Sequence, residues 1–164
     1  MAGPTRWLTP EEQAAWRAYL GSTRLLVHAL DRQLEADAGL SFTEYETLVR
    51  LSEAPGRRLR MRDLAGASAA TRSGVTRTVT RLERAGLVRR VECEQDRRGM
   101  HAELTDAGAA ALAAAAPGHV ASVRAHLFDH LDPADVGRLR ELFGRIRDGL
   151  DVTGEGAQAV PPAA

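Results

Sequence analysis

Residues 71–104 read TRSGVTRTVTRLERAGLVRRVECEQDRRGMHAEL, and the periodicity of this stretch decides the fold. In its first part, apolar residues recur at helical spacing at Val75, Val79 and Leu82. Most of the positions between them are polar, and several carry an arginine or a hydroxyl group. The spacing therefore predicts a helix over residues 71–85 with one apolar face and one basic face.

The second part of the stretch changes from helical spacing to alternation. Val91 stands between charged neighbours, and after residues 95–99 the side chains of Met100, Ala102 and Leu104 alternate with polar ones. Alternation on both sides of a turn-forming segment predicts a β-hairpin, with Asp-Arg-Arg-Gly at its tip.

The residues before this stretch complete a compact unit. The sequence predicts a helix after Ser41, a short extended segment at residues 57–60 and a short helix at residues 61–66. Small residues separate the last of these from the helix at 71–85. Two short helices joined by a tight turn make a helix-turn-helix, and a hairpin that follows makes it a winged helix. We expect residues 42–104 to form this lobe.

Longer helices flank the lobe. Residues 9–12 read TPEE, a helix start with a capping box and a proline in the first turn, and helical spacing continues over residues 9–38. An alanine-rich helix is expected over residues 105–130, interrupted at residues 117–118, and a last helix over residues 132–150. The predicted fold class is mainly α with a small β-hairpin wing, that is, a winged helix-turn-helix plus long helices.

Large apolar side chains are scarce for a chain of 164 residues. Of the apolar residues 29 are alanine, one is isoleucine and seven are aromatic. A core this thin favours elongated helices that bury one face against a partner, so we expect the helices in 9–38 and 105–150 to mediate dimerisation. The last helix carries an apolar seam suited to such packing. Its members are Val136, Leu139, Phe143, Ile146 and Leu150.

The net charge of zero conceals an uneven distribution of arginine. All 22 basic residues are arginine, and residues 56–101 hold twelve of them against five acidic residues, a net charge of +7. The rest of the chain carries ten arginines and seventeen acidic residues. A basic middle between acidic flanks is typical of a nucleic-acid-binding module within a larger scaffold.

Several classes of protein are disfavoured. The chain has no apolar run long enough to span a membrane and no signal-peptide pattern, and its single cysteine disfavours a disulfide framework, so we expect a cytoplasmic protein. It carries no P-loop, nucleotide-binding glycine pattern or nucleophile–base set, so we do not expect an enzyme or a cofactor.

Five motifs lie at fixed distances along the chain. They are Leu64-Ala65, Thr71-Arg72-Ser73-Gly74-Val75-Thr76-Arg77, Leu82-Glu83-Arg84-Ala85-Gly86-Leu87-Val88, Asp96-Arg97-Arg98 and Leu104-Thr105-Asp106-Ala107-Gly108. In order and spacing they resemble the multiple-antibiotic-resistance regulator (MarR) family of winged-helix transcription factors, over about residues 9–150. The resemblance implies one MarR-type domain over residues 1–164, and composition predicts a disordered tail at 151–164.

The resemblance also implies a function. It implies an obligate homodimer with one recognition helix per subunit in successive major grooves of double-stranded DNA, at a pseudo-palindromic operator, and release by a small-molecule effector. We expect a transcriptional repressor that does not associate with membranes.

Two segments are the expected DNA contacts. The start of the helix at 71–85 should enter the major groove, where an arginine fork suits guanine and hydroxyl groups suit phosphates. Its candidate residues are Thr71, Arg72, Ser73, Thr76 and Arg77. At the wing tip, the resemblance assigns Arg97 and Arg98 to DNA, with Arg98 in the minor groove and Asp96 holding an arginine side chain in place. A solvated polar face and a surface turn are the alternatives.

The resemblance implies an effector pocket between the first helices and the dimer helices. Aromatic residues and one arginine there would suit an aromatic acid or a phenol. The candidates are Trp16, Tyr19, Arg24, His28, Phe42 and Tyr45, for each of which plain core packing is an equal alternative.

Other interpretations stay open at this point. Cys93 suggests a redox switch, but alternation places it on the Val91 side between two glutamates, which favours a buried and unreactive thiol. His126 and His130, four residues apart, suggest a metal-responsive regulator, but spacing completes no ligand set and no metal site is expected. A more remote alternative is a winged-helix module that binds proteins only.

Overall fold

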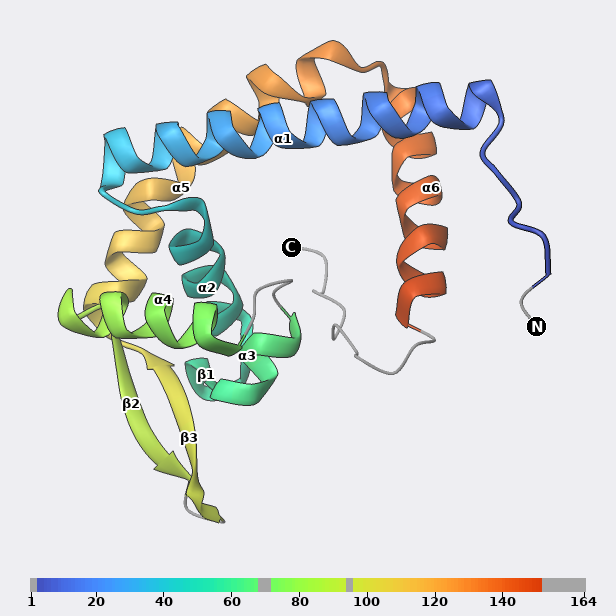
Figure 1. Ribbon diagram of the computed structural model, residues 1–164. Helices are drawn as coiled ribbons and strands as arrows, with labels where there is room; N and C mark the ends of the chain where they lie inside the picture. The colour runs from blue at the N-terminus through green and yellow to red at the C-terminus, as the bar shows by residue number, and fades with distance from the viewer. Residues whose placement is uncertain (1–2, 68–71, 94–95, 152–164) are drawn as a thin grey trace.

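The computed structural model describes residues 3–67, 72–93 and 96–151, and it divides into a helical scaffold and a compact lobe (Figure 1). The scaffold consists of α1 (Pro10–Ala38), α5 (Asp106–His126) and α6 (Pro133–Asp151). Helices α1 and α5 lie side by side, with the lobe below one end and α6 below the other.

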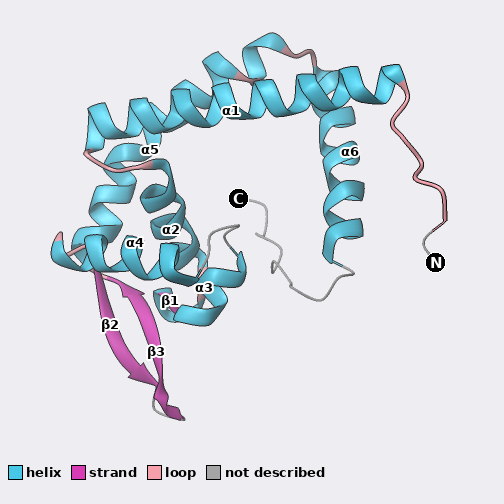
Figure 2. Cartoon of the chain, in the orientation of Figure 1, coloured by secondary structure: helices cyan, strands magenta, loops and turns pink. Residues whose placement is uncertain are grey.

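The lobe contains three helices and a small antiparallel sheet with the strand order β1-β3-β2 (Figure 2). Short 3-10 turns at Pro55–Arg57 and Phe128–His130 connect the larger elements. The helices and strands of the lobe are α2 (Phe42–Glu53), α3 (Met61–Ala67), α4 (Arg72–Arg84), β1 (Arg58–Arg60), β2 (Val88–Cys93) and β3 (Asp96–Leu104). The expected winged helix-turn-helix is therefore confirmed.

Capping boxes set the starts of α1 and α2. The Thr9 backbone N–H donates to the Glu12 carboxylate at 2.7 Å while Glu12 N donates to the Thr9 hydroxyl at 3.2 Å. Ser41 and Glu44 repeat the arrangement at α2. Each box satisfies backbone N–H groups that a helix start leaves without partners, which is why the chain turns into a helix at these points.

One apolar cluster holds the lobe together. The apolar stripe predicted for residues 71–85 lies within it, since Val79 and Leu82 of α4 are almost fully buried against α2, α3 and the sheet. A smaller cluster of Leu34, Tyr45 and Ala115 joins α1, α2 and α5. The lobe therefore has its own core, and the scaffold reaches it through α2 and α5.

The start of helix α5 packs closely against the backbone of the turn that follows α4. A Cβ atom on Gly108 would lie 2.1 Å from the backbone carbonyl oxygen of Leu87 and 2.7 Å from Leu104 Cδ1. The Thr105 side chain, which caps α5, also donates to the Gly86 carbonyl at 2.8 Å. Only glycine fits at position 108 without moving backbone.

The extended segment expected at 57–60 is confirmed, and it supplies a third strand, because Arg58–Arg60 pairs with β3. One local expectation needs correction. Helix α5 continues through Pro117 and ends at His126 rather than breaking at residues 117–118. Met100 is exposed, unlike Ala102 and Leu104 on the same strand, because it lies farther along the hairpin than the lobe core reaches. No helix in the described ranges is both long and apolar enough to cross a membrane.

Replacing Gly108 with alanine should lower the stability of the fold. The added methyl group meets a backbone atom, and such overpacking costs about 1–3 kcal/mol, so the melting temperature should fall. The control is Gly137→Ala in α6, where a Cβ meets nothing within 4 Å and the melting temperature should stay the same or rise. Equal melting temperatures for Gly108→Ala and the wild type would contradict the assigned contact.

Candidate DNA-binding surface

Helix α4 presents two opposite faces. Val75, Val79 and Leu82 are buried in the lobe, whereas the side chains of Thr76 and Arg77 are exposed. Ser73 is exposed on the same outer face. Arg72 begins the helix, but its side chain lies outside the described residues, as does Thr71 altogether. Hydroxyl and guanidinium groups on one exposed helix face match the donors that contact phosphates and base edges.

Arg77 is the one arginine of the predicted set whose side chain the structure describes. Its Nε lies 3.4 Å from the carbonyl oxygen of Ser73 one turn earlier, and no acidic side chain in the described ranges pairs with it. The charge of Arg77 is therefore available to a ligand on the outer face of α4.

Arg90 of β2 has the opposite arrangement. Its guanidinium bonds Glu83 Oε2 at 2.9 Å, Thr80 Oγ1 at 2.7 Å and the Thr76 carbonyl oxygen at 3.4 Å. All three partners belong to α4. Arg90 therefore fastens the last two turns of α4 to the sheet.

Among the described residues, ion pairs engage at least five arginines of the basic segment at 56–101, which the sequence did not reveal. Three of the acidic partners, Glu44, Glu103 and Asp106, lie outside that segment, so a count along the chain misses them. The pairs are Arg57–Asp106, Arg62–Asp63, Arg81–Glu44, Arg89–Glu103 and Arg90–Glu83. The positive charge available to a ligand is therefore smaller and more localised than the composition indicates.

The wing extends beyond the lobe from the end of α4 (Figure 2). Strands β2 and β3 pair from Val88 with Leu104 to Cys93 with Asp96, with a register shift at Glu92/Cys93. The side chains of Cys93 and of residues 96–98 lie outside the described residues. The roles expected for Asp96, Arg97, Arg98 and Cys93 therefore stay predictions.

The matching family model is that of the MarR family, over residues 38–99. The repressor YetL of Bacillus subtilis, described as an HTH-type transcriptional repressor, is 32% identical over 114 residues, which is 68% of each chain. The chain belongs to the MarR family of transcriptional regulators. Among solved structures, Sco3205 of Streptomyces coelicolor, crystallised in complex with DNA, is 46% identical with a TM-score of 0.85, over 91% of this chain and 93% of that one. AbsC of the same organism is 47% identical with a TM-score of 0.81, over 89% and 98%.

The effector residues expected in this MarR chain lie at three places within one chain. Trp16 and Tyr19 of α1 stack with ring centroids 5.9 Å apart, and Tyr19 also contacts Phe143 of α6 at 5.6 Å. Phe42 and Tyr45 lie in the α2 region instead. Arg24 and His28 are exposed on α1.

His119 of α5 is the residue that the sequence analysis did not assign to this region. Its ring lies 4.4 Å from that of Tyr45 and 6.2 Å from that of Phe42, and its Nδ1 atom is buried without a hydrogen-bond partner among the described residues. Burial raises the pKa of the Tyr45 hydroxyl and lowers the pKa of the His119 imidazole. Both side chains are therefore neutral near pH 7.

A cavity of about 350 Å³ lies between α2 and α5, on the side of the lobe where Arg57 pairs with Asp106. Its wall is mostly apolar, with the polar groups of Tyr45, Ser52 and Arg57. Among the six effector candidates, Tyr45 alone lines it. The remaining wall is formed by Val49, Leu104, Ala109, Leu112, Ala113 and Ala116.

His126 and His130 do not form a metal site with other described residues. The Nδ1 atom of His126 lies 2.8 Å from the Ser122 carbonyl oxygen, within its own helix, and His130 lies in a separate 3-10 turn. In the part of the chain that the structure describes, no three His, Cys, Asp or Glu side chains gather as a metal would require.

The Arg77→Ala variant tests the exposed face of α4. If Arg77 contacts a phosphate, the slope of log affinity for DNA against log salt should flatten by about 0.9 unit, because one fewer counterion is released. Affinity titrations at several salt concentrations measure this slope. Arg124→Ala, on the part of α5 remote from the lobe, should leave it unchanged. If Arg77→Ala keeps the wild-type slope and loses discrimination at one base pair, Arg77 reads a base.

Proposed function

We propose that this chain is a homodimeric repressor that binds a specific, pseudo-palindromic site in double-stranded DNA. The observation that carries the proposal is the outer face of α4, which exposes hydroxyl and guanidinium groups beside a projecting wing. Family membership, a relative crystallised with DNA and a relative described as a repressor support it. In this proposal residues 42–104 form the DNA-binding lobe, and the outer turns of α4 enter the major groove.

The dimer is proposed from apolar surface that the single chain leaves uncovered. Helix α6 stands apart from the lobe (Figure 1), and Phe143, Ile146 and Leu150 are 41%, 55% and 67% exposed. Trp16 and Tyr19 of α1 are exposed next to this helix. Continuous exposed apolar surface is rare on monomers and marks an interface. The seam with Val136 and Leu139, and the helices in 9–38 and 105–150, are the proposed dimer contacts.

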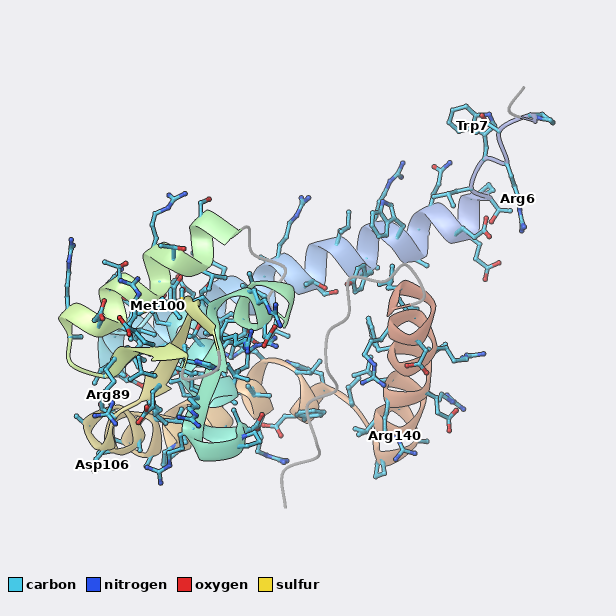
Figure 3. All side chains as sticks on the ribbon, turned by 90° about the horizontal axis from the view of Figure 1, so that it is seen from below. Arg6, Trp7, Arg89, Met100, Asp106 and Arg140 are labelled. Carbon is cyan, nitrogen blue, oxygen red and sulfur yellow. The ribbon has the colours of Figure 1, made fainter. Side chains whose placement is uncertain are left out.

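Arginine is spread over both parts of the molecule, as Figure 3 shows with Arg89 on the lobe and Arg140 on α6. What makes the lobe the DNA-binding part is therefore the combination of exposed α4 residues and wing. Two such lobes, held by paired scaffolds, would present their α4 helices to major grooves one helical turn apart, about 34 Å.

Release by a small molecule is the second part of the proposal. The junction of α1, α2 and α5 around Tyr45 and His119 and the adjacent, mostly apolar cavity suit an aromatic or phenolic ligand. Metal or redox control of the same fold is the alternative. We propose no catalytic activity and a cytoplasmic location.

DNA binding can be tested by selection, which does not require a known operator. The wild-type protein is used to select duplexes from a random 30-base-pair library, and affinity for the best one is compared with that for a scrambled duplex of the same composition. We expect a palindromic consensus and at least a thousandfold preference, as specific DNA-binding proteins show. Failure to enrich any duplex would favour a winged-helix module that binds proteins only.

The Phe143→Asp variant tests the dimer. The substitution places an unpaired charge in the apolar seam, which costs several kcal/mol if the seam is buried between subunits. Sedimentation velocity should show a monomer, and binding to the selected duplex should be lost because paired half-sites need both lobes. Arg145→Asp, on the opposite side of α6, should remain dimeric. If the Phe143→Asp variant remains dimeric, α6 is not part of the dimer interface.

A further inference from the structure

Glu44 is a buried carboxylate that makes two separate sets of contacts. Only 3% of the residue is exposed, so both carboxylate oxygens need partners within the protein. Oε2 accepts from the Ser41 backbone N–H at 2.8 Å and from the Ser41 hydroxyl at 2.9 Å, which closes the cap of α2. Oε1 lies 3.0 Å from Arg81 Nε of α4. The cap needs only Oε2, so the Arg81 contact is an additional link between α2 and α4.

Arg81 lies one helical turn after Arg77 on the polar side of α4. From the sequence the two arginines look equivalent, but the structure gives them different partners. Arg77 has no acidic partner in the described ranges, whereas the Nε of Arg81 is held against Glu44. An arginine engaged in this way fixes the rotation of its helix about the helix axis, because its guanidinium is planar and directional.

The same corner is attached to the scaffold. The Phe42 backbone N–H, in the first turn of α2, donates to Asp31 Oδ1 of α1 at 2.8 Å. Contacts therefore run from α1 through the start of α2 to Glu44 and Arg81. Arg90 holds the opposite side of α4 through Thr80 and Glu83. Helix α4 is thus fixed from the scaffold side and from the sheet side.

We propose that Glu44 and Arg81 are positioning residues for DNA recognition, which set the orientation of α4 relative to the dimer scaffold and do not contact DNA themselves. The inference rests on the proposed DNA binding. It gives two arginines of one helix different roles, because Arg77 faces the ligand whereas Arg81 orients the helix. Sequence-specific contacts depend on helix orientation, whereas non-specific attraction to phosphates depends mainly on charge.

Three roles for Arg81 give different results. A phosphate contact would raise affinity for any duplex and contribute to the salt slope, and neutralising Glu44 nearby would then tighten binding. A role in stability alone would change the melting temperature but not the affinity of the folded protein. A positioning role predicts weaker binding to the specific duplex for both Glu44→Gln and Arg81→Gln, with little change for a scrambled duplex.

The experiment uses the full chain, the best duplex selected by the wild-type protein from a random 30-base-pair library, and a scrambled duplex of equal composition. Affinities of Glu44→Gln, Arg81→Gln and the double variant are measured by fluorescence anisotropy at 20 °C, where circular dichroism verifies folding. We expect each single variant to lose roughly tenfold in affinity for the selected duplex and less than about twofold for the scrambled one. The double variant should lose no more than either single variant, because the two residues act as one unit.

The matched control is Arg84→Gln, which removes the same charge from the same helix at an exposed position with no ion pair among the described residues. It should not reduce the ratio of specific to non-specific affinity. Equal losses by Arg81→Gln on both duplexes with a flatter salt slope, tighter binding by Glu44→Gln, or unchanged affinities with a lower melting temperature would each overturn the proposal.

Two further outcomes separate the proposed function from the positioning role. If Glu44→Gln is not folded at 20 °C, Arg81→Gln decides alone, since the Arg81 side chain is 62% exposed and its replacement leaves the apolar core untouched. If the wild-type protein selects no duplex, the proposed function fails. If it does select one and the variants keep the wild-type specificity ratio, only the positioning role fails.

Discussion

The close contact of α5 with the turn after α4 is the constraint on which the rest of the structure depends. Gly108 lets the helix start directly on the Leu87 backbone, and Thr105 bonds the Gly86 carbonyl there. Farther along, α5 lies against α1 in the scaffold. One continuous helix therefore belongs to both parts, so the position of the lobe follows from the position of α5. A looser contact would leave the orientation of α4 undetermined.

Ion pairs fix the orientation of α4 in addition to this packing. The arginines of the lobe divide into those that hold structure and those that remain available to a ligand. Arg81 and Arg90 fix α4 through Glu44 and Glu83, whereas Arg77 keeps its charge on the outer face. Because most of these pairs join different elements, each adds orientation as well as modest stability. A regulator that reads DNA needs this division, since its helix must be both charged and rigidly oriented.

Periodicity predicted most of the fold. Helical spacing of Val75, Val79 and Leu82, followed by alternation, was sufficient for the winged helix, and the capping box at Thr9 located the start of α1. Features that depend on contacts between distant segments could not be predicted. The extended segment at 57–60 was predicted but its pairing with β3 was not, and α5 continues through Pro117 while it packs along α1.

The candidate site was predicted only in part, because some of its features also depend on contacts between segments that are distant in sequence. A helical pattern places Ser73, Thr76 and Arg77 on one face, and the structure places all three on the exposed side of α4. The ion pairs of Arg81 and Arg57 involve acidic residues far away in sequence, which no local pattern marks. The effector candidates stay predictions. Within one chain Trp16 stacks with Tyr19, whereas Tyr45 contacts His119, a contact that no local pattern marks.

Hydroxyl-radical footprinting of the selected duplex tests the central claim most directly, namely that two rigidly held α4 helices and two wings engage one face of DNA. The account predicts protection in two symmetric half-sites with centres about 10 base pairs apart, one dimer per duplex, and weaker protection in the flanking minor grooves where the wings lie. A single protected segment, or two segments whose spacing varies among bound duplexes, would contradict it.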